Sequence, residues 1–377
     1  MQSLTHGAVA WWLIAVAMSV TLGLVLLAPR HASAAQVRVA CRNAAGDAAA
    51  INAAIAGSRA GDEIVIAGQC LIDQVIELRG RRAYRGESRT GTVVKQADGA
   101  NLPAIFASDS YLENSPTTGT PISLRHLTIA GNKAQNGGAA TNGIALRSWE
   151  SVIEDVFITD MGGNGILLTN TSLDGVKLTN TQVNGQINGN FINASGGHGI
   201  YVQDSGNSVT DWQLLNNWIA GSGADAIHME NAAGWMIERN HVYGVPGNAI
   251  YANRLWGTSI ADNYIEGFGS SKQAGNYGGI VAKVQGGTAS TISGNRVFNH
   301  ESNAKTQYRY IDVSVNYGTG VVAVTGNVVR ASGESSGTGL TYNGGAHTLV
   351  VASSGNAVFG VHTDKIVGSG VTESTGI

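Results

Sequence analysis

Short segments with alternating apolar and variable residues recur along the chain after residue 120. Each segment has Gly or Ala, an apolar residue, a variable residue and a second apolar residue. The copies begin at Gly143, Gly165, Gly199, Ala226, Ala249, Gly279 and Gly339, and one further copy begins at Tyr310. Because side chains alternate between the two faces of a strand, both apolar residues point to one side. The pattern predicts one short β-strand per repeat, with its apolar face in a core.

A second repeat places an asparagine at a fixed position between two apolar residues. Its members are Asn190, Asn217, Asn240, Asn263, Asn295, Asn327 and Asn356, which are 27, 23, 23, 32, 32 and 29 residues apart. Short strands and a turn asparagine at this irregular period are typical of a parallel β-solenoid, whose loops tolerate different lengths. We expect about ten to eleven coils stacked about 4.8 Å apart, with the asparagines in one ladder.

A cap is expected before the repeats. Gly46 and Asp47 precede an alanine-rich segment, residues 48–56, which favours a short helix. The following Gly61 and Asp62 predict a turn into the first strand. A helix over the open end of a solenoid would cover an exposed strand edge. The expected organisation is a signal peptide or membrane anchor at 1–34, a cap at 35–63, the solenoid at 64–360 and a C-terminal tail at 361–377.

Residues 46–55 and the strand that follows them resemble the N-terminal cap of pectate-lyase-like right-handed parallel β-helix proteins. The G-I-x-L and G-N-x-I repeats resemble the coils of the same superfamily, and the resemblance covers about residues 37–360. It implies an all-β, right-handed parallel β-helix with a short helical cap. The superfamily includes polysaccharide lyases, polygalacturonases, mannuronan C5-epimerases and phage tailspike glycosidases. The resemblance therefore implies a long polysaccharide that lies along the outside of a β-sheet.

Composition narrows the class of protein. The chain has 52 glycines, 5 prolines, 43% hydrophobic and 13% charged residues, and a formal net charge of −3. This apolar content with so few charges argues against disorder, and the many glycines argue against a helical bundle. The chain has no basic block, so we expect no nucleic-acid partner bound through phosphate contacts.

The first 34 residues differ from the remainder. Residues 8–28 are almost wholly apolar and are followed by Pro29, Arg30 and a run of small residues that ends at Ala34. This pattern predicts a cleaved signal peptide. The run is also long enough to span a bilayer, so a retained membrane anchor is the alternative. Both alternatives place the rest of the chain outside the cytoplasm, as a secreted, periplasmic or cell-envelope protein.

The two cysteines, Cys41 and Cys70, follow this segment closely. An even pair in an exported chain predicts one disulfide, and two buried free thiols are the alternative. The chain has no C-x-x-C sequence, so neither a redox motif nor a zinc site is indicated. The sequence does not decide the oligomeric state.

The outward-pointing residues of the repeated strands include one polar cluster. The first outward column is Ala145, Leu167, Tyr201, His228, Tyr251, Val281, Asp312 and Thr341, and the second is Arg147, Thr169, Gln203, Glu230, Asn253, Lys283, Ser314 and Asn343. Neighbouring turns add His198, Asp204, Asp225 and Arg254. Each residue alone is explained by a surface strand or a turn. Together, aromatic and ionisable groups in three successive coils predict a sugar-binding and catalytic site.

One interpretation is β-elimination or C5 epimerisation of a uronic-acid polymer. His228 would be the base and Tyr251 or Tyr201 the acid, while Asp225 would orient His228 or hold a calcium ion. The cations available to neutralise the substrate carboxylate are Lys283, Arg254 and Arg147. The other polar members, His198, Gln203, Asp204 and Asn253, would bind substrate.

Two alternatives stay open. One is glycoside hydrolysis by the carboxylates Asp225 and Glu230, or with Asp204 in place of one of them. Residues 223–227 resemble the G-D-D-C-I turn of polygalacturonases but retain only its second aspartate, and their N-T-D and R-I-K motifs are absent. The other alternative is a carbohydrate-binding or surface solenoid without catalysis.

Overall fold

The computed structural model describes residues 34–113, 119–178, 180–271, 274–300, 306–332 and 337–375. The predicted export segment, apart from Ala34, lies outside these residues. The chain divides into two units, Met1–Ala35 and Gln36–Ile377, and the second unit contains every helix and strand named below. In the described ranges no helix is both long enough and apolar enough to cross a membrane.

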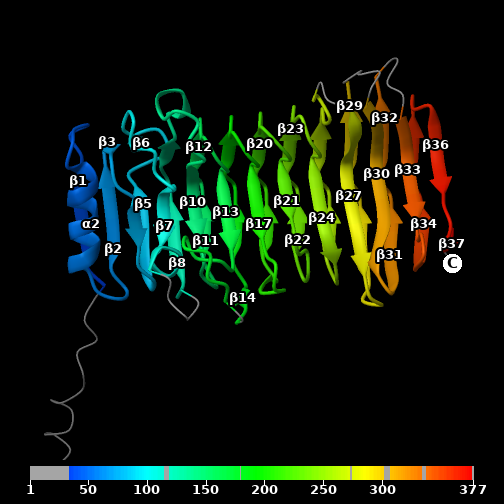
Figure 1. Ribbon diagram of the computed structural model, residues 1–377, viewed down its shortest axis with the longest axis horizontal. Coiled ribbons are helices and arrows are strands. Elements are labelled where there is room, and N and C mark those ends of the chain that lie inside the picture. Colours follow the sequence, from blue (N-terminus) through cyan, green and yellow to red (C-terminus); the bar gives the residue numbers. More distant parts are fainter. Residues whose placement is uncertain are drawn as a thin grey trace, which may run out of the picture. The chain divides into compact units, whose positions relative to one another are not determined.

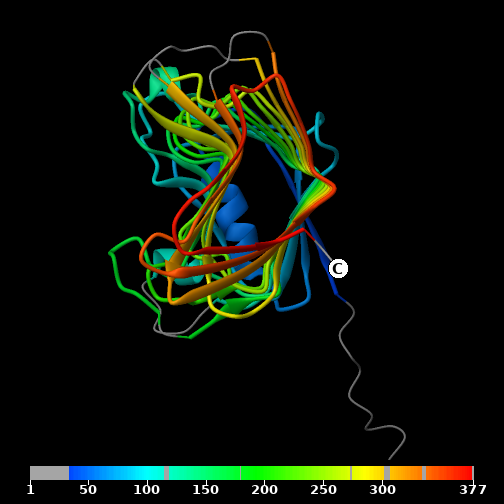
Figure 2. The ribbon, with the colours of Figure 1, turned by 90° about the vertical axis from the view of Figure 1, so that its right-hand side faces the viewer.

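The second unit is a parallel β-helix whose coils follow one another along its length (Figure 1). Three long sheets enclose the core, as the view down the long axis of the solenoid shows (Figure 2). Sheet I consists of β1 (Gln36–Ala40), β2 (Glu63–Ala67), β5 (Arg82–Gly86), β8 (Ile122–Arg125), β11 (Val152–Glu154), β15 (Gln186–Asn188), β19 (Gln213–Leu215), β22 (Met236–Glu238), β25 (Ser259–Ala261), β28 (Ser290–Ser293), β31 (Thr319–Thr325), β34 (Thr348–Ser354) and β37 (Val371–Ser374).

Sheets II and III each contain 11 strands, in agreement with the predicted ten to eleven coils. Sheet II consists of β4 (Ile76–Leu78), β7 (Ala104–Ser108), β10 (Asn142–Leu146), β13 (Ile166–Thr169), β17 (Ile200–Gln203), β21 (Ile227–Met229), β24 (Ile250–Leu255), β27 (Gly275–Gln285), β30 (Thr306–Tyr317), β33 (Gly337–Asn343) and β36 (Thr363–Val367). Sheet III consists of β3 (Gln69–Ile72), β6 (Val93–Gln96), β9 (Thr128–Ala130), β12 (Phe157–Thr159), β16 (Phe191–Asn193), β20 (Trp218–Ala220), β23 (His241–Tyr243), β26 (Tyr264–Glu266), β29 (Arg296–Asn299), β32 (Val328–Ala331) and β35 (Ala357–Phe359). The prediction of an all-β, right-handed parallel β-helix is confirmed.

The sheets continue past residue 360, the boundary predicted from the repeats. β36 pairs in parallel with β33, and β37 pairs in parallel with β34. These last strands lack the Gly-Ile motif and the turn asparagine, so their sequence carries no repeat signal. Residues 363–374 nevertheless add one more strand to each of sheets I and II.

The apolar positions of the repeats fill the core in register. Ile200, Ile227 and Ile250 lie opposite one another in β17, β21 and β24, and each is 0% exposed. Full burial of one such side chain contributes about 1.5–3 kcal/mol. The glycine before each strand allows a close approach. A Cβ atom on Gly199 would lie 2.4 Å from the Cγ2 atom of Ile219.

The asparagine ladder between sheets I and III is confirmed. The Nδ2 atom of Asn217 donates to Asn240 Oδ1 at 3.0 Å, and the Nδ2 atom of Asn240 donates to Asn263 Oδ1 at 3.0 Å. The same contact continues through all seven predicted members, Asn190, Asn217, Asn240, Asn263, Asn295, Asn327 and Asn356. Each Oδ1 atom also accepts a backbone N–H, so the ladder satisfies buried polar groups that would otherwise destabilise the turn.

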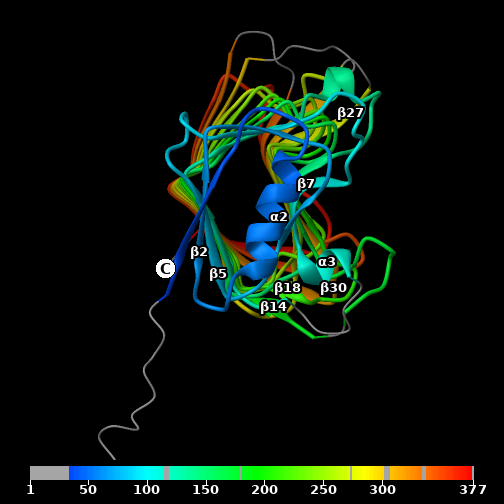
Figure 3. The same ribbon diagram turned by 90° about the vertical axis from the view of Figure 1, so that its left-hand side faces the viewer.

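The N-terminal end carries the helix α2 (Asp47–Gly57), which lies across the opening of the coils (Figure 3). Its residues Ile51 and Ile55 are buried against the first strands. The predicted disulfide is confirmed, because Cys41 and Cys70 are bonded, with their Cα atoms 5.0 Å apart. It joins the segment before α2 to β3. Smaller elements are α3 (Asp109–Leu112), the 3-10 helix η1 (Lys133–Gln135) and the pair β14 (Gln182–Val183) and β18 (Val209–Thr210).

Candidate active site on sheet II

The first predicted outward column is present on sheet II. Tyr201 lies opposite His228, His228 lies opposite Tyr251, and Tyr251 lies opposite Val281 in the parallel register. The rings of His228 and Tyr251 stack with centroids 4.6 Å apart, and Tyr201 meets His228 edge-on at 5.5 Å. Strand pairing therefore places one imidazole between two phenols on the outside of the solenoid.

His228 is oriented by Asp225, which precedes β21. The Nδ1 atom of His228 is 2.7 Å from Oδ2 of Asp225. The other oxygen, Oδ1, accepts the backbone N–H of Asn248 at 2.6 Å and its Nδ2 at 3.1 Å. Because a carboxylate can only accept, Nδ1 is the donor in this hydrogen bond. The contact therefore selects the tautomer of the neutral imidazole in which Nε2 is the basic nitrogen.

Tyr201 is paired with Glu230. Its hydroxyl donates to Oε1 of Glu230 at 2.6 Å, and Oε2 of Glu230 accepts the backbone N–H of Asp204 at 2.9 Å. Burial and the neighbouring Glu230 raise the pKa of Tyr201 above its ordinary value. Tyr201 therefore stays protonated, and both oxygens of Glu230 already accept hydrogen bonds.

Tyr251 and Lys283 are the freer polar groups of the column. Within the described part of the chain, the hydroxyl of Tyr251 has no hydrogen-bond partner and Lys283 forms no ion pair. The Nζ atom of Lys283 lies 5.2 Å from the centroid of the Tyr251 ring, a cation–π distance. A phenol and an ammonium group thus lie beside the oriented imidazole.

Two predicted site residues have structural roles. Arg147 is 0% exposed, and its guanidinium donates to the carbonyls of Ser110 at 2.7 Å and Val176 at 3.3 Å. Burial lowers the pKa of Arg147. This arginine is not available to a bound polymer, which corrects the prediction. Asp204 is also buried, and it accepts the backbone N–H groups of a turn, including that of Val209 at 2.8 Å.

The first strands of sheet II are covered rather than open. Tyr111 of α3 packs on Ala145 and Leu167, the first members of the outward column. Leu112 adds to the same small apolar cluster. The open part of the column therefore begins at β17. Sequence repeats alone could not show this, because α3 lies in an insertion between coils.

The remaining predicted residues lie around the column. Gln203 accepts a hydrogen bond from Thr169 at 3.0 Å through Oε1. Asn253 has a buried Oδ1 atom without a hydrogen bond. Arg254 follows it and lines a cavity at the end of β24.

His198 adds a third potential metal ligand beside Asp225 and His228. Its ring centroid lies 4.6 Å from that of His228 and 5.0 Å from that of Tyr201. Burial and the nearby His228 lower the pKa of His198, and its buried Nδ1 atom makes no hydrogen bond of normal geometry. One ligand atom from each of His198, Asp225 and His228 lies within 4.8 Å of the others.

Sequence reasoning missed an aromatic row on sheet III. It consists of Phe157, Phe191, Trp218, His241 and Tyr264, which lie in register on successive coils. The row could have been recognised from the sequence, since four of its five residues directly follow a ladder asparagine. The rings of Phe157 and Phe191 stack at 4.8 Å with planes 10° apart, so they cover each other's faces. This packing stabilises neighbouring coils.

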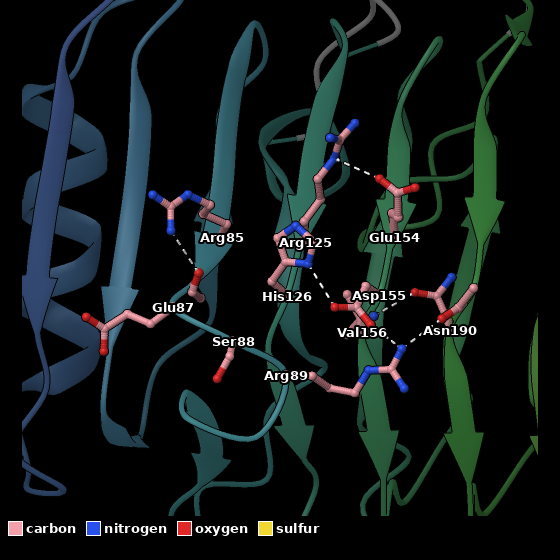
Figure 4. A network of polar contacts seen from close by, with 12 residues as sticks. Arg85, Glu87, Ser88, Arg89, Arg125, His126, Glu154, Asp155, Val156 and Asn190 are labelled. Carbon is pink, nitrogen blue, oxygen red and sulfur yellow. Dashed lines mark hydrogen bonds and ion pairs between the residues drawn. The ribbon is translucent and has the colours of Figure 1, made fainter.

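A second cluster that was not predicted is polar and lies in the turns that follow strands β8 and β11 of sheet I (Figure 4). The Nδ1 atom of His126 is 2.8 Å from Oδ2 of Asp155, and Arg89 forms an ion pair with the same carboxylate. Arg89 also donates to the carbonyl of Gly189 at 3.1 Å. Although partial burial raises it, the hydrogen bonds from His126 and Arg89 leave the pKa of Asp155 below its ordinary value.

Comparisons with known proteins agree with this fold. A family model described as "Periplasmic copper-binding protein (NosD)" matches residues 73–279. No curated protein matches the chain. The resemblance to right-handed β-helix proteins is confirmed by solved structures. The Agl-KA catalytic domain has a TM-score of 0.53 at 11% identity, with 92% of this chain and 69% of that chain covered.

Two further similar structures are those of an exopolygalacturonase and of a module of a mannuronan C-5 epimerase. The family 28 exopolygalacturonase of Yersinia enterocolitica has a TM-score of 0.51 at 11% identity, and the match covers 90% of this chain and 78% of that chain. The A-module of mannuronan C-5 epimerase AlgE6 from Azotobacter vinelandii has a TM-score of 0.45 at 17% identity, with 88% and 96% covered. The two likenesses with TM-scores above 0.5 support the fold alone, and the chemistry is argued from the site.

Proposed function

The chain belongs to the family described as periplasmic copper-binding protein (NosD), whose model matches more than half of it, and we propose that it acts outside the cytoplasm on an acidic polysaccharide as a lyase or C5-epimerase. One observation carries this proposal. His228 has its Nδ1 proton held by Asp225 and presents a basic nitrogen between two tyrosines on an open sheet face.

The geometry suits removal of the C5 proton of a uronate residue. The Nε2 atom of His228 takes the proton, and the ammonium of Lys283 stabilises the negative charge that develops on the substrate carboxylate. The hydroxyl of Tyr251 then donates a proton. Donation to the departing O4 oxygen gives elimination, whereas donation to the opposite face of C5 gives epimerisation.

The carboxylates of the cluster support hydrolysis less well. A glycoside hydrolase of the usual type needs one carboxylic acid and one available carboxylate on either side of the scissile bond. Asp225 is engaged by His228 and Asn248, and Glu230 is engaged by Tyr201 and the backbone of Asp204. Their lone pairs therefore serve to orient other groups.

Location outside the cytoplasm rests on two features. The Cys41–Cys70 disulfide is of the kind that persists in oxidising compartments. The family description is that of a periplasmic protein. Both agree with the export segment expected from the sequence.

A panel of polymers tests the proposal. Polygalacturonate, alginate and a neutral glucan are incubated with the protein, and unsaturated-product absorbance and reducing ends are followed together. We expect absorbance, or a changed C5 configuration by NMR, with the acidic polymers only. Reducing ends without absorbance would favour hydrolysis, and no change in any polymer would favour the non-catalytic solenoid.

Metal binding is a second candidate function, which the family description and the His198–Asp225–His228 cluster favour. The Nδ1 atom of His198, which makes no hydrogen bond of normal geometry, is available as a ligand. Two imidazoles and a carboxylate suit copper(II) or zinc better than calcium, which prefers oxygen ligands only. Bound copper would supply a Lewis acid on the outward face.

Copper titration separates the two candidates. Calorimetry and electron paramagnetic resonance of the wild type should show one copper(II) site with nitrogen ligands, and His198→Ala should lose it. His228 cannot act as a base while it is a metal ligand, so bound copper should inhibit turnover. Absence of a nitrogen-ligated site in the wild type would exclude this candidate and leave the polysaccharide proposal intact.

A further inference from the structure

A cavity of about 520 Å³ lies beside the polar column, at the ends of β21 and β24. Its walls include Arg254, Trp256, Asn231, Asp211, Gln285 and Thr288. Arg254 follows Tyr251 by three residues, and three residues of extended strand span about 10 Å. This is longer than one pyranose ring. A polymer whose reacting unit lies at Tyr251 would therefore place a different sugar residue in this cavity.

The backbone presents Arg254 in an unusual way. The pairing of β24 with β27 shifts register between Ala252 and Leu255, which marks a β-bulge. Arg254 has φ 55°, in the left-handed region that an arginine rarely adopts. Bulges next to active sites re-aim a side chain that would otherwise follow the pleat. Among the described residues Arg254 has no ion pair, so its guanidinium is available to a ligand.

Trp256 supplies a fixed aromatic surface to the same cavity. The residue is 45% exposed. The backbone of Gly286 packs against its ring, since a Cβ atom there would lie 1.9 Å from Cζ3 of Trp256. An exposed ring supported on one side can stack on the apolar face of a sugar.

Asn231 and Asp211 complete the cavity wall. Asn231 is 0% exposed and donates through Nδ2 to Asp204 at 2.7 Å and Asn207 at 2.9 Å, yet its Oδ1 atom has no partner. These contacts hold Asn231 in the cavity wall. Asp211, also in the wall, is exposed and accepts a hydrogen bond from Thr210, so its carboxylate is an acceptor that sugar hydroxyl groups can reach.

From these features we infer that the Arg254–Trp256 cavity is a binding subsite for a uronate residue next to the reacting unit. Arg254 binds the sugar carboxylate, Trp256 stacks on the ring, and the exposed Asp211 accepts hydrogen bonds from hydroxyl groups. The inference rests on the proposed function only for the identity of the polymer. It adds the requirement that the polymer carries a carboxylate on a unit that does not react.

Binding to polygalacturonate and alginate, measured by affinity electrophoresis and calorimetry, tests the subsite. Arg254→Gln should weaken binding of these polymers about 10- to 100-fold, the usual effect of a lost charge-assisted contact. Methyl-esterified polygalacturonate should bind the wild type and Arg254→Gln equally. Trp256→Ala should weaken both the free acid and the ester about 10-fold. All variants are compared by thermal unfolding.

Matched controls lie on other faces. Arg239 has φ 55°, is exposed in a turn and forms an ion pair with Glu238, and Trp218 is 49% exposed on sheet III. Arg239→Gln and Trp218→Ala should bind as the wild type does. If Arg254→Gln fails to fold, Arg254→Asn suits the left-handed backbone better and should show the same loss of binding.

The outcomes separate the subsite from the proposed catalysis. Wild-type affinity in Arg254→Gln and Arg254→Asn would overturn the subsite, even if His228→Ala abolishes turnover. Weakened binding in these variants would support it, even if the wild type turns over no polymer. Equal dependence on Arg254 for dextran sulfate would overturn the assignment to a carboxylate.

Discussion

Two histidine–carboxylate pairs of nearly equal length lie on different faces of this solenoid. The Nδ1–Oδ2 distance is 2.7 Å between His228 and Asp225 and 2.8 Å between His126 and Asp155. Their surroundings differ. Asp225 is held by the neutral amide of Asn248, whereas Asp155 is also bound by the guanidinium of Arg89.

The two pairs also differ in exposure and in neighbours. The side chains of His228 and Asp225 are 25% and 11% exposed, and those of His126 and Asp155 are 44% and 37% exposed. His228 lies between two tyrosine rings on an open strand. His126 and Asp155 lie in the turn that the asparagine ladder occupies in later coils, and they hold that turn where the ladder is absent (Figure 4). A histidine–carboxylate pair alone therefore does not identify a catalytic site.

The largest expected difference between the pairs is in turnover. Asp225→Asn should lower kcat on the acidic polymer about 10²–10⁴-fold, because an amide can stabilise the wrong tautomer of His228. KM should change less, since the lost interaction belongs mainly to the transition state. Asp155→Asn, the same change in the other pair, should leave kcat within about twofold. Equal effects of the two substitutions in steady-state assays would remove the distinction.

The next expected difference concerns the aromatic neighbours. Tyr251→Phe should lower kcat about 10²-fold or more, because it removes the proposed proton donor and keeps the ring. Tyr264→Phe alters a ring of the aromatic row on sheet III and should leave kcat unchanged. A Tyr251→Phe enzyme as fast as the wild type would show that another group donates the proton.

The smallest expected effect is on stability and belongs to the turn pair. The pKa of Asp155 is lower in the folded chain than its ordinary value of 3.8. The pair therefore contributes its full stability above about pH 4, and this contribution is lost as the pH falls below that value through the lower pKa of the folded chain. Asp155→Asn should lower the free energy of unfolding by about 1 kcal/mol or less at pH 7, because the pair is partly exposed. Urea unfolding at pH 7 and pH 3 should show this difference shrink, and a larger difference at pH 3 would contradict the assignment.

The sequence was sufficient for features that repeat. The spacing of the Gly-Ile strands placed Tyr201, His228 and Tyr251 in one register, and the turn asparagines formed the predicted ladder. The isolated cysteine pair in the chain predicted the disulfide. The strand register and the ladder follow from local sequence patterns that recur from coil to coil.

Features created by departures from the repeat could not be predicted. Arg147 occupies an outward position, but an insertion that contains α3 buries it. The bulge at Arg254 depends on the register between two strands, which a single motif does not reveal. The pair of His126 and Asp155 joins residues 29 apart in two turns that carry no asparagine.

The central claim is that His228 removes the C5 proton of a uronate residue on the open face of sheet II. Release of tritium into water from C5-tritiated polygalacturonate or alginate measures this step directly, because both elimination and epimerisation release it and hydrolysis does not. The wild type should release tritium, His126→Ala should match it, and His228→Ala should be slower by about 10²–10⁴-fold. A wild type that releases no tritium, or a His228→Ala variant that releases it at the wild-type rate, would contradict the claim.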